Sequence, residues 1–452
     1  MTDPVRQYFC YPSNQIASFE PGSSVASDPG YFRFGPALVC YGKTSAGYRS
    51  KIHDQRLYDT ADDIAIQHDT IRLPFDLREV VTNLTHERYL ESSTGEPGKL
   101  LRQLYYALRP MLPTPLRSPL QRLYLTNKAK CSFPAWPVDT TVDELMTKLL
   151  LLGMKTAGLD SLPFIWFWPD GASACSIMTH DVEAEGGKQF CSALMDIDEQ
   201  FGVPASFQIV PEQRYAVTLE FIDSIRCRSF EINVQDLNHD GRLFWDYERF
   251  KHRVQRINDY GRQFKALGFR SGILYRRQEW FDLLDFQYDM SVPNVGHFDP
   301  QRGGCCTVMP YFIGKILELP VTTSQDHTVF HYLKRYSLDL WRSQIESIIG
   351  KHGLISFIFH PDYLRERRAM ASYKELLVEL QRLRSTKNLW ITQPSDVNKW
   401  WRNRAEMRLA LRNGKWTIEG RDKERACVAF AALEDDKIVY TVPSRAAGLV
   451  PA

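Results

Sequence analysis

The chain has 452 residues, of which 44% are hydrophobic and 24% charged; this is an ordinary globular composition, long enough for two or three structural units. Its 56 basic and 54 acidic residues leave a net charge of +2, which argues against a protein that binds nucleic acid through bulk charge. No apolar run approaches the roughly 20 residues that span a bilayer, and no secretory signal is visible at the start. Nine cysteines without C-x-x-C spacing fit a reducing compartment, so we expect a cytoplasmic protein.

Residues 1–160 form the first predicted unit. Short strand-like runs alternate there with Gly, Pro, Ser and Asp clusters, which predicts a small α/β or mostly β accessory region. Within it, the segment 97–138 contains no acidic residue and mixes Lys and Arg with Leu, Tyr and Pro. One interpretation is peripheral contact with an anionic membrane surface. The alternative is a pair of proline-broken helices packed on the main domain with their basic side in water.

Residues 161–404 alternate between strand-like and helix-like segments. Strands are predicted at 173–179, 205–210, 269–275, 354–359 and 389–391, and helices at 187–201, 247–267 and 373–383. This βαβ alternation predicts a parallel sheet, and polar residues at strand ends predict a barrel whose site lies at the carboxyl ends of its strands.

Residues 405–452 change to short alternating runs. Asn413-Gly414 separates two of them and is typical of a hairpin turn. We therefore predict a small antiparallel β appendage after the barrel.

Two short stretches in the central unit carry candidate chemistry. The strand 173–179 runs into Asp181 and Glu183, whose side chains share one face of an extended chain. His239 lies in a second polar stretch further along the chain. A carboxylate and an imidazole suit Zn²⁺ or a similar divalent ion, while the other carboxylate stays free to take a proton from water.

The order of the later motifs makes this pattern specific. Arg270 follows an apolar run, and His360 ends the apolar strand 354–359. Together these motifs resemble the polysaccharide deacetylases, the NodB-homology group of carbohydrate esterases, over about residues 165–400. The resemblance implies a distorted (β/α) barrel, a divalent metal, and hydrolysis of an acetyl group.

The resemblance also implies roles for individual residues. Asp181 matches the catalytic base, Arg270 the arginine that holds it, and His360 the catalytic acid. Glu183 and His239 match metal ligands, with zinc the expected ion and manganese or cobalt as alternatives. For substrate binding, Asp289 and Tyr288 match a groove motif, and the aromatic rings of Trp280 and Phe298 are candidates to stack on a sugar.

The chain departs from the family pattern at two positions. Gln235 stands where the family has the first histidine of H-x-x-x-H, and Gly272 stands where it has the proline of R-x-P. Three interpretations of Gln235 are open: it coordinates a harder ion through oxygen, a histidine from elsewhere completes the site, or the site is vestigial. His297 and His327 are candidates for the second, and Asp326 could orient the ring of His327.

Two functions from different classes follow. The first is a metal-dependent hydrolase that deacetylates a sugar in glycan, exopolysaccharide or glycolipid metabolism, on a scaffold that also suits other carbon-nitrogen bonds. The second is a non-catalytic carbohydrate-binding or scaffolding member of the family, with Gln235 marking an impaired metal site.

Overall fold

The computed structural model describes residues 3–13, 15–22, 26–45, 50, 56–90 and 133–443. Most of the basic segment predicted for membrane contact, 97–138, lies outside these residues, and only 133–138 of it is described. In the described part of the chain, no helix combines the length and the apolar character needed to cross a membrane.

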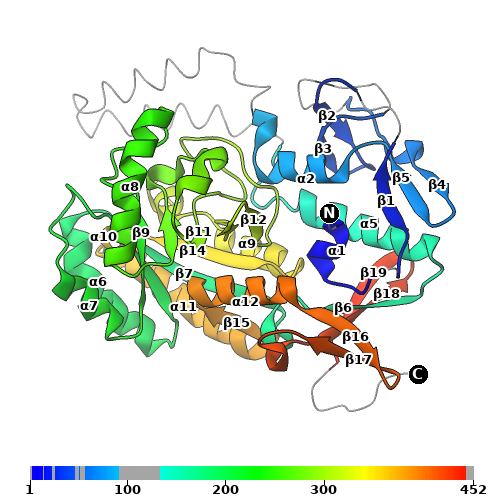
Figure 1. The fold of residues 1–452 in the computed structure, drawn as a ribbon. Coiled ribbons are helices and arrows are strands. Elements are labelled where there is room, and N and C mark those ends of the chain that lie inside the picture. The colour runs from blue at the N-terminus through cyan, green and yellow to red at the C-terminus, as the bar shows by residue number, and fades with distance from the viewer. Residues whose placement is uncertain are drawn as a thin grey trace.

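A nine-stranded sheet forms the centre of the described structure (Figure 1). Its strand order is β12-β13-β11-β10-β9-β8-β7-β14, and β15 pairs with the first half of β7. All pairs in it are parallel except β12 with β13. The strands are β7 (Ala174–Val182), β8 (Ala205–Ile209), β9 (Glu231–Gln235), β10 (Gly268–Arg270), β11 (Tyr288–Asp289), β12 (Tyr311–Ile313), β13 (Ile316–Glu318), β14 (Leu354–Phe359) and β15 (Leu389–Thr392).

Helices alternate with these strands, as the sequence predicts. They are α6 (Glu185–Gln200), α7 (Leu219–Arg226), α8 (Tyr247–Gln263), α9 (Asp339–Ile349), α10 (Pro361–Leu364), α11 (Arg367–Lys387) and α12 (Pro394–Glu406). Side-chain caps fix several helix starts: Asp246, for example, accepts a 2.8 Å hydrogen bond from the backbone N–H of Arg249 at the start of α8. The predicted fold class, an α/β protein with an incomplete (β/α) barrel, is confirmed by this topology.

One predicted strand is shorter than expected. The strand predicted at 269–275 ends at Arg270. The chain then forms a tight turn over Gly272–Leu274, in which Ile273 has a φ of 61°. The turn directs the chain away from the sheet immediately after Arg270, so this side chain stands at a strand end.

The N-terminal elements pack beside the barrel (Figure 1). They are α1 (Pro4–Phe9), β1 (Ser18–Pro21), β2 (Gly30–Arg33), β3 (Val39–Gly42), β4 (Ala65–Gln67), β5 (Thr70–Leu73), α2 (Leu77–Thr85), α5 (Thr141–Thr156) and β6 (Ser161–Ile165). The described part of this region is thus an α/β unit built from short strands.

The C-terminal hairpin is confirmed. β16 (Arg408–Arg412) and β17 (Lys415–Glu419) are antiparallel and flank Asn413-Gly414. The following pair, β18 (Val428–Glu434) and β19 (Lys437–Thr441), does not stand alone, because β18 also pairs with β6.

A shared core joins these end regions to the barrel. One hydrophobic cluster includes Phe9 near the N-terminus, Ala429 on β18, and Cys175 and Ile177 on the central strand β7. A second cluster lies between the barrel strands and their helices and includes Met178, Leu194 and Leu376. The predicted unit boundaries at 160/161 and 404/405 remain predictions, and the packing across them is continuous.

A buried ion pair ties the N-terminal region to a barrel loop. Arg276 donates through Nε to Glu87 Oε2 at 2.6 Å and through Nη2 to Glu87 Oε1. Their side chains are 0% and 5% exposed, respectively. Such a pair is costly to break because either partner alone would be a buried charge without a counter-charge.

We predict that Glu87→Gln lowers the free energy of unfolding by about 3–5 kcal/mol, since Arg276 would stay buried without its carboxylate. Urea denaturation followed by fluorescence measures the change. Glu375→Gln is the matched control because its ion pair with Arg342 is exposed, and we expect no measurable change there. Equal effects of the two substitutions would contradict the prediction.

Candidate active site

The carboxyl ends of four barrel strands bring the predicted residues together. Asp181 lies near the end of β7 and Glu183 just after it, Gln235 and Arg270 end β9 and β10, and His360 follows β14. Because these strands are parallel neighbours in the sheet, their carboxyl ends meet at one edge. The sequence therefore identified side chains that the fold places around one point.

Asp181 and Arg270 form a buried ion pair. Arg270 Nη1 donates to Asp181 Oδ1 at 2.6 Å and to Thr179 Oγ1 at 2.8 Å, and its Nε donates to the Met290 carbonyl at 3.1 Å. Burial raises the pKa of Asp181 above its ordinary value, although the Arg270 charge opposes this effect. The carboxylate is thus fixed in direction and is a stronger proton acceptor than a solvated aspartate.

Glu183, Gln235 and His239 form the second group. His239 Nε2 lies 2.8 Å from Glu183 Oε1, and Gln235 Nε2 donates to Glu183 Oε1 at 2.9 Å and to Asp181 Oδ2 at 3.2 Å. Burial raises the pKa of Glu183, but the two nearby histidines outweigh it and hold that pKa well below its usual range. Burial likewise lowers the pKa of His239, but the charge of Glu183 outweighs it, so this pKa lies above its ordinary value.

Two atoms of this group have no hydrogen-bond partner among the described residues. They are His239 Nε2, which is close to Glu183 but not aligned for a hydrogen bond, and Gln235 Oε1. Both are buried, and unpaired buried polar atoms are costly in a folded protein. The two ends of a carboxamide have nearly the same shape, so Oε1 can replace Nε2 beside the carboxylate by rotation of the group. A carboxylate, an imidazole and a carboxamide oxygen are then a donor set that fits a divalent ion.

A second possible donor set shares the same carboxylate. Ligand atoms of Asp181, Glu183 and His360 all lie within 4.8 Å of one another. Asp181 is already held by Arg270 and the Nδ1 of His360 by Asp326, whereas His239 Nε2 and Gln235 Oε1 have no hydrogen-bond partner among the described residues. The set of Glu183, Gln235 and His239 is the better fit for these reasons.

His360 is oriented by Asp326. Asp326 Oδ1 lies 2.7 Å from His360 Nδ1, and Asp326 Oδ2 accepts from the His360 backbone N–H at 2.7 Å. The other ring nitrogen, Nε2, lies 3.5 Å from Glu183 Oε1. Burial opposes protonation of the ring, but the two carboxylates outweigh it and raise the pKa of His360 well above its ordinary value.

The orienting role of Asp326 differs from the one considered from the sequence. Its side chain contacts His360 rather than the ring of His327, whose pKa burial lowers to about 4. His327 packs its ring against Tyr363 and Tyr332, and His297 is buried elsewhere, so neither joins the group of donors described above. No motif in the sequence points to Asp326, because the contact joins residues 34 positions apart.

Arg214 is a further residue that the sequence analysis missed. Its Nε donates to the backbone carbonyl of Glu183 at 2.7 Å, and its charge acts on His239. The neighbouring Tyr215 donates to the Val182 carbonyl at 2.7 Å and accepts from the Val210 N–H. This loop therefore holds the backbone that carries Glu183.

Gly272, which stands where the resemblance implies a proline, has a local packing role. A Cβ atom at Gly272 would lie 2.5 Å from Asp236 Oδ2 and 3.0 Å from His239 Cδ2. Asp236 and His239 both have positive φ values, 53° and 54°, which bring this loop against the turn after Arg270. Gly272 thus makes room for the loop that delivers His239.

The structure corrects the predicted substrate contacts of Tyr288 and Asp289. Both side chains are completely buried. The Tyr288 hydroxyl bonds to Glu231 and Asn233 toward the amino end of β9, whereas the site lies at the carboxyl end. Asp289 pairs in register with Phe269, so its side chain points to the opposite face of the sheet from Arg270. Neither residue is open to a sugar.

Trp280 lies within an aromatic group, with its ring centroid 5.3 Å from that of Phe250 and 6.1 Å from that of Phe244. It is partly buried and packs against the hydrophobic cluster between the barrel strands and their helices. Its contact with substrate remains a prediction.

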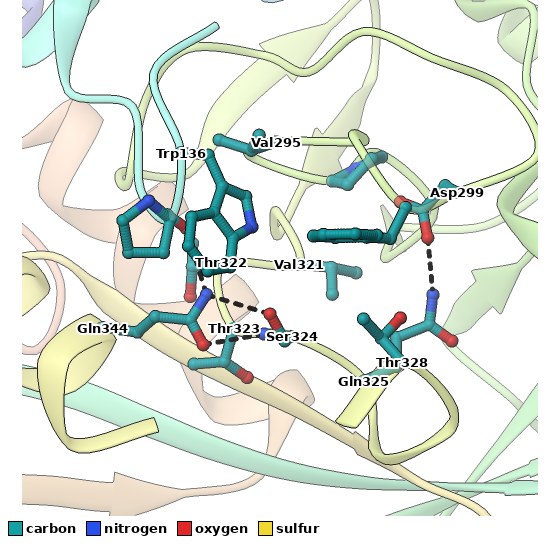
Figure 2. A pocket seen from close by; sticks show the side chains of 13 residues that line it. Trp136, Val295, Asp299, Val321, Thr322, Thr323, Ser324, Gln325, Thr328 and Gln344 are labelled. Atoms are coloured by element: carbon teal, nitrogen blue, oxygen red, sulfur yellow. Dashed lines mark hydrogen bonds between the residues drawn. The ribbon is translucent and has the colours of Figure 1, made fainter. Parts of the chain in front are cut away.

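Phe298 lines a separate pocket next to the loop that carries Asp326 (Figure 2). Trp136 forms an edge-to-face pair with it across the pocket, with ring centroids 5.9 Å apart. The amide groups of the lining are already partnered: Gln325 donates to Asp299 at 3.1 Å, and Gln344 bonds to Ser324 and the Pro137 carbonyl. The pocket therefore offers aromatic surface but few free polar groups.

Solved structures with a similar fold cover about half of this chain. A Mycobacterium smegmatis protein described as a polysaccharide deacetylase is 19% identical, with a TM-score of 0.43, over 53% of this chain and 93% of its own. PuuE allantoinase is 13% identical with a TM-score of 0.40, covering 52% and 92%. A Pseudomonas aeruginosa PAO1 protein described as a polysaccharide deacetylase is 12% identical with a TM-score of 0.40, covering 52% and 92%.

The likeness of these structures to this chain is one of fold, over about half of its length. No protein-family model and no curated protein matches the sequence.

We predict that Gly272→Ala lowers the free energy of unfolding by about 1–3 kcal/mol, because the new methyl group overlaps Asp236 and His239. Gly350→Ala is the control, since a Cβ there meets only ordinary contacts at 3.4 Å. Thermal unfolding of both variants measures the difference. If Gly272→Ala unfolds at the same temperature as the wild type, the loop that carries His239 moves aside for the methyl group without loss of stability, and the prediction is wrong.

We predict that Asp326→Asn lowers the pKa of His360, because the ring loses the carboxylate that stabilises its charged form. Because this pKa is raised in the folded protein, it adds stability that is complete at low pH and is lost as pH rises through the folded-state pKa of His360. In Asp326→Asn, this loss of stability should occur at lower pH. NMR titration of the His360 ring in metal-free protein measures the shift. Asp339→Asn, an exposed aspartate, should leave the titration unchanged.

Proposed function

We propose that this chain is a metal-dependent hydrolase that removes an acetyl group from an acetylated sugar. The observation that carries the proposal is the cluster of Asp181, Glu183 and His360, whose oxygen and nitrogen atoms lie within 4.8 Å of one another. In it, Arg270 holds the base Asp181, and Asp326 holds His360. A base, an acid and a set of metal donors at one sheet edge are the parts that acyl hydrolysis requires.

Asp181 is proposed as the general base. Its carboxylate takes a proton from the water that attacks the acetyl carbonyl carbon, and Arg270 keeps it aimed and favours its ionised form. Glu183, His239 and Gln235 would hold the ion, which when bound polarises the acetyl carbonyl and lowers the pKa of water. Zinc is the expected ion, with manganese or cobalt as alternatives, since the donors are a carboxylate, an imidazole and an amide.

His360 is proposed as the general acid. Asp326 keeps the ring protonated and fixes its Nδ1, so that Nε2 can donate to the departing nitrogen or oxygen as the bond to the acetyl carbon breaks. An acetylated carbohydrate or glycolipid is the proposed substrate. Loss of Asp181 or His360 is expected to reduce the rate by about 10²- to 10⁴-fold.

A second candidate is a non-catalytic carbohydrate-binding member with an impaired metal site. The specific observation in its favour is that Gln235 Nε2 donates to both Asp181 and Glu183, a contact that links the two carboxylates with no ion required. Metal affinity distinguishes the two candidates, since a binding module with this amide contact does not need the ion.

Metal analysis of the purified protein after incubation with Zn²⁺, Mn²⁺ or Co²⁺ tests the proposal. We predict near-stoichiometric metal that is lost in Glu183→Ala and His239→Ala and kept in Asp181→Ala. Gln235→His should bind the ion more tightly, because imidazole nitrogen is a stronger zinc ligand than a carboxamide oxygen. Deacetylation of acetylated sugars is then measured on the loaded protein, with Asp181→Ala as the inactive control.

Three outcomes would contradict this assignment in different ways. Metal lost in Asp181→Ala and His360→Ala but kept in His239→Ala would place the ion among Asp181, Glu183 and His360 instead. Unchanged affinity in Gln235→His would remove residue 235 from the ligand set. Absence of metal under all conditions would favour the binding module.

A further inference from the structure

A pair of buried carboxyl groups lies on the next two strands of the sheet beyond β10, the strand that carries Arg270, and has no role in the proposed reaction. Asp289 on β11 and Glu318 on β13 are register partners in neighbouring parallel strands, so their side chains share one face of the sheet. Adjacent strands lie about 4.8 Å apart. Both residues are 0% exposed. Two carboxylates in such a position cannot both be ionised without strong mutual repulsion.

The hydrogen bonds of the pair leave one carboxyl oxygen on each residue without a partner among the described residues. Asp289 Oδ2 accepts from Ser291 Oγ at 2.5 Å, and Glu318 Oε1 accepts from the Val292 N–H at 2.9 Å. Asp289 Oδ1 and Glu318 Oε2 are buried and have no partner among the described residues. Two ionised carboxylates would leave both of these acceptors unsatisfied. A single proton between them would make one oxygen a donor and the other its acceptor.

The charges around the pair favour one negative charge there. Arg270 and Arg276 act on it as cations, and each is also paired with one other carboxylate, Asp181 and Glu87, respectively. Two further titratable groups face Glu318, the buried Cys305 thiol and Tyr311 hydroxyl, and burial keeps both neutral by raising their pKa values well above the ordinary range. Burial also raises the pKa of Asp289 and of Glu318, and each carboxyl disfavours ionisation of the other.

The pair is connected to the backbone beside Arg270. Ser291 Oγ donates to Asp289 and accepts from the Ser271 N–H at 2.8 Å. Ser271 directly follows Arg270, whose Nε bonds to the Met290 carbonyl in the same segment as Ser291. This chain of hydrogen bonds fixes the strand end from which the guanidinium reaches Asp181.

We propose that Asp289 and Glu318 share one proton and, through Ser291, act as positioning residues for Arg270 and hence for the base Asp181. The shared proton is a property of the fold and stands without the proposed function. The positioning role rests on that function. The two parts are therefore tested separately.

The proton is tested by urea unfolding of metal-free protein at pH values from about 5 to 9, for the wild type and Glu318→Gln. Glutamine keeps an acceptor for Val292 N–H and offers an N–H to Asp289, so it imitates the protonated glutamate. A folded-state pKa above the unfolded value gives stability that is lost as pH rises. The urea concentration at the unfolding midpoint should therefore fall in the wild type, relative to that of Glu318→Gln, as pH rises.

Glu375→Gln, on the exposed face of α11, is the control and should follow the wild type at every pH. Parallel curves for the wild type and Glu318→Gln would overturn the shared proton. So would a difference that grows toward low pH, because it would mean that Glu318 is ionised in the folded protein.

The positioning role is tested by Ser291→Ala and Ser291→Thr, assayed for deacetylation at neutral pH. Loss of one buried hydrogen bond should lower kcat about tenfold in Ser291→Ala with KM unchanged. Threonine keeps the hydroxyl and should restore kcat. Equal activity of the alanine variant, or a change confined to KM, would overturn the role. If the wild type deacetylates nothing, the proposed function fails, whereas the unfolding curves still decide the shared proton.

Discussion

The buried ion pair between Arg270 and Asp181 is the contact on which the arrangement of the site depends. A guanidinium that is 0% exposed needs a counter-charge, and Asp181 supplies it at 2.6 Å. The pair links β7 to β10 across the strands that lie between them. It therefore fixes the direction of the proposed base at the sheet edge where the other residues meet.

Charge balance around this pair explains why the remaining groups have their properties. Glu183 lies between the rings of His239 and His360 and remains ionised despite its burial. His360 in turn keeps its proton because Asp326 lies on its far side. A proton acceptor, Asp181, and a proton donor, His360, thus lie within 4.8 Å of each other beside this carboxylate, and the proposed hydrolysis uses both.

The two departures from the family pattern meet in space. Gly272 makes room for the loop that carries Asp236 and His239, and that same loop begins directly after Gln235. A proline at 272 would add atoms where Asp236 and His239 already lie, so the glycine and this loop conformation belong together. The glutamine changes the donor set without disturbing this packing, because its amide reaches the same two carboxylates.

The sequence by itself determined the alternation of strands and helices, the hairpin at Asn413-Gly414, and the four strand-end residues Asp181, Glu183, Arg270 and His360, because hydrophobic periodicity and local motifs are encoded over a few residues. Only the tertiary structure decided that Asp326 orients His360 and that Tyr288 and Asp289 are buried. The first contact joins residues 34 positions apart. The second depends on strand register, where a shift of one residue turns a side chain from one face of the sheet to the other.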